Sequence, residues 1–112
     1  AAARSVTIGG MNMGLGLGSR ESFIYDENGK MLNPNLRTYK PMRFNDEPEY
    51  LIEFIESPET DGPYGARGLG EHGLVGIPAA LMNSLSTAVL ANLNQLPLTP
   101  EYIWREKTGG TI

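Results

Sequence analysis

The stretch GPYGARGLGEHG, residues 62–73, divides the chain into two parts with different patterns. Short apolar segments separated by turn residues precede it, and a long helical pattern follows it. The stretch spaces Gly68, Gly70 and Gly73 as G-x-G-x-x-G and places Glu71 between glycines ahead of a helix. Glycine lets a backbone turn sharply or approach another group closely. The loop therefore indicates a functional site, and its flanks indicate the fold.

The strongest helix pattern follows this loop. Pro78 fits the first turn of a helix that begins near Ile77, and apolar residues at helical spacing continue to about Leu93. The width of this apolar surface predicts a long buried helix. A short C-terminal helix is expected from Thr99, which can cap it, to Gly109, which can end it.

The first part of the chain combines a glycine-rich segment with a turn. Residues 5–8 predict a short strand. Residues 9–21 predict a glycine-rich helix that only tight packing can hold, because each interior glycine costs about 1 kcal/mol relative to alanine. Residues 23–32 predict a β-hairpin around Asn28-Gly29, since this dipeptide tolerates the positive φ angles of a tight turn.

A further strand is expected before the loop. Residues 33–48 contain three prolines and predict an irregular connection. The alternating pattern of residues 50–56 suits a largely buried strand that ends before Pro58. The elements together predict an α+β fold: glycine-rich helix, β-hairpin, further strand, active-site loop, long buried helix and short C-terminal helix.

The composition disfavours several classes of function. The chain has a net charge of −4 and scattered basic residues, so no basic stripe exists to bind nucleic acid. It has no cysteine, which excludes disulfides and thiolate ligation of an iron–sulfur cluster. No apolar run approaches the roughly 18 residues of a membrane span, and the first residues lack the apolar region of a signal peptide. We therefore expect a cytoplasmic protein with no nucleic-acid or membrane partner.

Several interpretations compete for the loop. A dinucleotide-binding loop needs a strand that runs into the first glycine and an acidic residue about 20 positions later. Pro58 and Pro63 separate the predicted strand from the first glycine of the loop. Residues 90–98, where the acidic residue would be expected, contain no carboxylate. A general base at Glu71 needs neither feature, because glycines leave space beside it and a helix N-terminus follows. A merely solvated glutamate is the remaining alternative.

The single histidine, His72, cannot form a histidine-based metal cluster within the chain. We expect it to be a hydrogen-bonded neighbour in the loop rather than a catalyst. No serine has the sequence context of a nucleophile elbow. The sequence therefore predicts no metal ligands of its own.

Four motifs in order resemble the C-terminal part of the molybdenum hydroxylases, the family of xanthine dehydrogenases and aldehyde oxidases. They are the glycine-rich segment 9–16, YDENG at 25–29, LRTYKP at 36–41 and GARGLGE at 65–71. The resemblance implies that residues 1–112 are the C-terminal portion of a molybdopterin-binding domain. The chain departs from the family at Val6 and Met13, which align with glutamines, so the pterin contacts of those glutamines are not carried over.

The resemblance also implies roles for the loop. In that family the glutamate of the glycine–glutamate pair is the base that deprotonates a molybdenum-bound hydroxyl, and Glu71 falls on that position. Gly68 and Gly70 would line the cofactor pocket. The implied reaction oxidises a C–H group of an N-heterocycle, purine or aldehyde with water. The implied cofactor is molybdenum–molybdopterin, either plain or as the cytosine dinucleotide, with [2Fe–2S] and FAD on partner domains or subunits.

The family's catalytic subunit is several times longer than this chain. The chain is therefore expected to be inactive alone, to need the remainder of the molybdenum-binding subunit, and to self-associate when isolated. The alternative of a different class is a non-catalytic binding or scaffolding module that retains the fold without redox activity.

Overall fold

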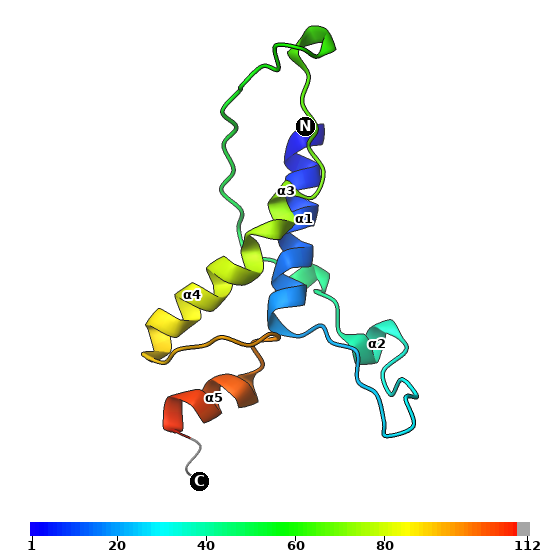
Figure 1. Ribbon diagram of the computed structural model, residues 1–112, viewed down its shortest axis with the longest axis vertical. Helices are drawn as coiled ribbons and strands as arrows, with labels where there is room; N and C mark the ends of the chain where they lie inside the picture. Colours follow the sequence, from blue (N-terminus) through cyan, green and yellow to red (C-terminus); the bar gives the residue numbers. More distant parts are fainter. Residues whose placement is uncertain (110–112) are drawn as a thin grey trace.

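The computed structural model describes residues 1–109, which form helices around one long N-terminal helix (Figure 1). In chain order the elements are α1 (Ala2–Ser19), α2 (Leu36–Tyr39), the 3-10 turns η1 (Phe44–Asp46) and η2 (Pro63–Gly65), α3 (His72–Val75), α4 (Ile77–Val89) and α5 (Pro100–Thr108). Figure 1 shows α3 alongside α1, with α4 diverging from its lower half and the turn around α2 on the opposite side. The helices α1, α3 and α4 therefore form the packed part of the structure.

A stripe of glycines on α1 makes this packing possible. Gly10, Gly14 and Gly18 are buried and recur every four residues, so they share one face of the helix. A Cβ added at Gly14 would lie 2.7 Å from the Ile77 Cβ, and one added at Gly73 of α3 would lie 2.6 Å from the Thr7 carbonyl oxygen. Only glycine allows backbones to approach so closely. The predicted dependence of the glycine-rich helix on tight packing is confirmed.

The strand predicted for residues 5–8 is wrong, because these residues belong to α1. Val6, Thr7 and Ile8 are β-branched and favour strands on their own. Here the Thr7 backbone supplies the surface on which Gly73 packs. This tertiary contact outweighs the local preference.

A small apolar core lies where the chain returns to the end of α1. Leu93 and Leu98 are each 3% exposed, and the Leu98 N–H donates to the Gly18 carbonyl at 2.7 Å. Leu90 adopts a left-handed conformation with φ 55°, which ends α4 at Val89 rather than at residue 93. Within α4 Pro78 is the buried residue. The helix predicted to be buried is therefore covered on one side only.

The C-terminal helix agrees with its prediction. The Thr99 Oγ1 accepts a hydrogen bond from the Tyr102 N–H at 3.2 Å, and Gly109 ends the helix with φ 66°. Pro100 occupies the first turn, where its missing N–H costs no hydrogen bond. Local capping chemistry thus decides both ends of α5.

The predicted β elements form no sheet among residues 1–109. The turn at Asn28-Gly29 exists, with Gly29 at φ 78°, but its arms share only an isolated bridge between Tyr25 and Met31. Residues 50–56 run extended without a pairing strand, and Leu51 and Ile55 are 88% and 94% exposed. A strand needs a neighbouring edge for its backbone groups. The described residues supply none, so the predicted β half of the α+β fold does not form here.

The overall shape is too open for a domain that encloses its own core. The radius of gyration is 17.8 Å, and the longest dimension is 59 Å. A compact domain of this length would have a radius of gyration of about 13 Å. None of the helices in the described part combines the length and hydropathy needed to cross a membrane. The fold therefore presents the loop on a helical support and leaves much apolar surface uncovered.

Candidate functional site

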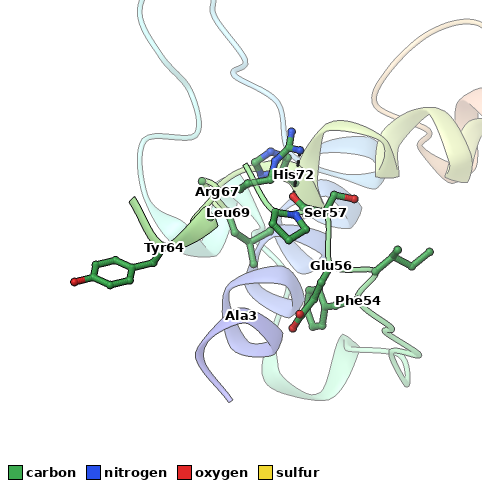
Figure 2. Close-up of a pocket in the computed structure, with 12 residues that line it drawn as sticks. Ala3, Phe54, Glu56, Ser57, Tyr64, Arg67, Leu69 and His72 are labelled. Carbon is green, nitrogen blue, oxygen red and sulfur yellow. Dashed lines mark hydrogen bonds between the residues drawn. The ribbon is translucent and has the colours of Figure 1, made fainter. Parts of the chain in front are cut away.

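Two hydrogen bonds fold the loop before α3 back on itself. The Glu59 N–H donates to the Gly65 carbonyl at 3.1 Å, and Gly65 adopts φ 68°, a conformation that favours glycine. The Arg67 Nη1 donates to the Ser57 carbonyl at 3.4 Å, shown by the dashed line in Figure 2. These bonds bring the chain after Arg67 alongside the end of the extended segment.

Glu71 stands where the loop enters α3. Its carbonyl accepts hydrogen bonds from the Leu74 N–H at 3.0 Å and the Val75 N–H at 3.3 Å, and the close contact of Gly73 with Thr7 holds this turn against α1. The Glu71 side chain is exposed. Its carboxylate forms no ion pair or hydrogen bond within residues 1–109. The backbone of this acid is therefore fixed, while its carboxylate is available to a group outside the chain.

His72, the first residue of α3, contacts the backbone on the other side of Glu71. Its Nδ1 accepts a hydrogen bond from the Gly70 N–H at 3.2 Å. The prediction that His72 is a hydrogen-bonded neighbour in the loop is confirmed. The bond leaves the neutral ring with its proton on Nε2.

Gly68 and Gly70 differ from the glycines of the helical support. A Cβ added at either position would meet no atom within 4 Å, and neither residue has a positive φ. Nothing in the described part of the chain therefore requires glycine at these two positions. Their small size keeps space free beside Glu71 for a group that the chain does not contain.

An open hollow of about 730 Å³ lies beside the loop (Figure 2). Loop residues Arg67, Gly68, Leu69 and His72 line it from one side, and residues 54–58 line it from the other. Of the predicted site residues, Gly68 lines this hollow, whereas Gly70 and Glu71 do not. The hollow is thus adjacent to Glu71 rather than centred on it.

Sequence patterns did not single out two charged residues of this hollow. Glu56 comes from the extended segment, and Arg67 comes from the glycine loop. The fold brings them to one site through the Arg67–Ser57 hydrogen bond, a contact between residues ten positions apart. No spacing rule links such residues, so only the folded loop reveals the relation.

The described residues contain no group of three or more His, Cys, Asp or Glu side chains that could hold a metal ion. The open space at Gly68 and Gly70 beside an unpartnered carboxylate fits a metal whose ligands belong to an organic cofactor. The G-x-G-x-x-G spacing has no strand before it, and Gly73 packs on α1, which argues against a dinucleotide-binding loop.

Comparison with known proteins also indicates a domain that binds a metal held by an organic cofactor. A family model described as molybdopterin cofactor-binding domain matches residues 1–48. The chain is 37% identical over 99 residues to the xanthine dehydrogenase molybdenum-binding subunit of Escherichia coli O157:H7, with 88% of the chain and 13% of the relative covered. It is 33% identical over 104 residues to the nicotine 6-hydroxylase large subunit of Paenarthrobacter nicotinovorans, with 90% of the chain and 13% of the relative covered.

A solved structure is also similar to this chain in its three-dimensional fold. The crystal structure of quinoline 2-oxidoreductase from Pseudomonas putida 86 matches with a TM-score of 0.85 and 28% identity, covering 94% of this chain and 14% of that one. This chain belongs to the molybdenum hydroxylase family. As a molybdenum hydroxylase fragment it corresponds to part of a molybdopterin-binding subunit. It spans only about an eighth of the length of the relatives it matches.

Proposed function

We propose that this chain is the C-terminal part of the catalytic subunit of a molybdenum-dependent hydroxylase and that Glu71 is its general base. The reaction converts a substrate C–H group and water into a C–OH group, two protons and two electrons. Glu71 takes up one of these protons at a carboxylate oxygen and returns it to solvent. The chain alone contains too little of the subunit to catalyse this reaction.

The fixed backbone and unpartnered carboxylate of Glu71 are the main support for this proposal. A general base needs a fixed position and an unpaired acceptor oxygen. The Glu71 backbone is fixed by α3 and by the Gly73–Thr7 contact, and its carboxylate has no partner within residues 1–109. A solvated surface glutamate would not require glycines with open space on its N-terminal side. The arrangement of these residues favours a base over the solvated alternative.

The cofactor proposed for this site is molybdenum–molybdopterin, in its plain or cytosine dinucleotide form. When bound, it supplies the redox chemistry that removes two electrons from the substrate. Gly68 and Gly70 would line its pocket, because both leave space that no atom of the described chain fills. Since the chain has no cysteine to ligate an iron–sulfur cluster, a [2Fe–2S] centre that accepts the electrons would belong to a partner domain or subunit, and we assign FAD to such a partner as well.

The proposed substrate class is a small N-heterocycle. The names of the three relatives above refer to xanthine, nicotine and quinoline, each of which contains a nitrogen heterocycle. An electron-poor ring carbon next to nitrogen suits attack by an oxygen nucleophile that a base activates. This choice favours heterocycles over aldehydes without naming one compound.

The experiment compares Glu71→Gln with wild type in the complete subunit assembled with its partners. Loss of the base should lower kcat by at least about 100-fold, the usual minimum for general-base catalysis. Glu53→Gln, another exposed glutamate outside the loop, is the matched control and should keep wild-type turnover. Near-normal turnover of Glu71→Gln with full molybdenum content would refute the assignment of Glu71 as the base.

A further inference from the structure

The hydrogen bond between Gly70 and His72 restrains the loop directly at Glu71. The Gly70 N–H donates to His72 Nδ1 at 3.2 Å, so one bond joins the two residues that flank the acid. Figure 2 shows the imidazole among the residues that line the hollow. His72 thus touches both the loop backbone and the open space beside it.

The two sides of Glu71 differ in how they are held. On the C-terminal side, α3 and its contact with α1 fix the backbone. On the N-terminal side, the backbone of residues 67–70 takes part in no backbone–backbone hydrogen bond in the described part of the chain. Two of these residues are glycines, which have the greatest backbone freedom. The imidazole therefore supplies the restraint that the backbone lacks.

We propose that His72 is a positioning residue that holds the Gly70 peptide and thereby directs the Glu71 carboxylate toward the group that it deprotonates. This inference rests on the proposed role of Glu71 as general base. The position of a catalytic group within a fraction of an ångström affects turnover strongly. His72 acts through the backbone and does not itself transfer the proton.

The proposal requires a neutral imidazole. Nδ1 accepts a hydrogen bond only while it carries no proton, and a protonated ring donates from both nitrogens. Glu56 and Arg67 are the charged residues that line the hollow together with His72. The acceptor nitrogen is therefore essential to the proposed role, and a side chain without an acceptor at this position cannot replace it.

The test uses two variants of the complete, partner-bound subunit. Asn places an acceptor oxygen at the same distance along the side chain as His Nδ1, whereas Phe keeps a ring without an acceptor. We expect His72→Phe to lower kcat by about 10- to 100-fold, in line with the effect of a misplaced catalytic group, with KM changed by less than about twofold. His72→Asn should restore most of this turnover, because its amide oxygen can accept the Gly70 N–H.

A second measurement is independent of catalysis. Amide hydrogen exchange of peptides that span residues 68–73, read by mass spectrometry, should be faster in His72→Phe than in wild type and His72→Asn. Equal exchange in all three proteins, or equal loss of turnover in both variants, would overturn the positioning role. If Glu71→Gln keeps normal turnover, the general-base proposal fails, whereas the exchange result still reports whether His72 restrains the loop.

Discussion

The helical support, residues 2–19 and 71–89, differs sharply from the open segment, residues 20–70. In the support, glycines bring backbones into contact, as Gly73 does on Thr7. In the open segment, Gly68 faces empty space and Ile55 is 94% exposed. The support is determined by contacts within the chain, whereas the open segment is shaped for groups outside it. Glu71 lies at the boundary between them. The helical support fixes its backbone, and its side chain is exposed next to the open segment.

The largest effect should come from filling a glycine contact of the support. Gly73→Ala would place a Cβ 2.6 Å from the Thr7 carbonyl oxygen, which is backbone and cannot move aside cheaply. Overpacking of this kind costs about 1–3 kcal/mol. Gly9→Ala is the matched control, because its Cβ would meet nothing within 4 Å and alanine favours a helix by about 0.5–1 kcal/mol. Opposite shifts in the thermal-inactivation midpoint of the complete subunit would confirm the contact, and equal shifts would contradict it.

The open segment predicts association of the isolated chain. Leu51 and Ile55 are almost fully exposed in a segment whose backbone lacks a pairing strand. The unpaired backbone groups of such a segment can form hydrogen bonds with a strand of another chain. Light scattering should therefore detect oligomers of residues 1–112 at high concentration, and Ile55→Lys should reduce their amount several-fold by adding a charge. A clean monomer before any substitution would show that the exposed surface does not drive association.

A smaller effect is expected when a loop glycine is changed. Gly68→Ala meets no atom of this chain, so it should leave the stability of the complete subunit within about 0.5 kcal/mol of wild type. If Gly68 lines the cofactor pocket, the added methyl group should instead reduce bound molybdenum or raise KM. Loss of stability with normal cofactor content would assign this glycine to the support instead.

The smallest effect concerns the ion pair between Asp46 and Arg20, the residue that follows α1. A hydrogen bond from the Arg43 backbone N–H and a second from the Arg20 side chain, at 2.7 Å, hold the pKa of Asp46 below its ordinary value of 3.8. A lowered pKa in the folded state stabilises the fold above the ordinary pKa, and this contribution is lost as pH falls through the lowered value. Asp46→Asn should thus lower the unfolding midpoint slightly at pH 7 and not in strong acid. The pH dependence of the difference between the two midpoints checks the sign.

Local chemistry made α5 and the Asn28-Gly29 turn predictable. Capping by Thr99 and the positive φ of Gly29 depend on few neighbouring residues. The helical state of Val6 to Ile8 was not predictable in this way, because it depends on contacts with α3 that lie more than 60 positions away. The pattern of residues 50–56 predicted a largely buried strand, but these residues form no strand in the described structure and Leu51 and Ile55 are exposed.

Some features of the candidate site could likewise be predicted from local sequence, and others could not. The glycine-flanked acid could be picked out from sequence because its spacing is local. The link between Arg67 and Ser57, and the bond from Gly70 to His72, could not, since both depend on how the loop folds back. The stripe of glycines in α1 was expected to need tight packing, yet the sequence did not reveal that α3 and α4 provide it.

A structure of the complete, cofactor-loaded subunit would show where the Glu71 carboxylate points. We predict that α1, α3 and α4 keep the packing described above and that the Glu71 carboxylate points into the cavity that holds the molybdenum centre, beside Gly68 and Gly70. A structure in which the same helices pack alike but this carboxylate faces bulk water, away from the cofactor, would rule out Glu71 as the general base.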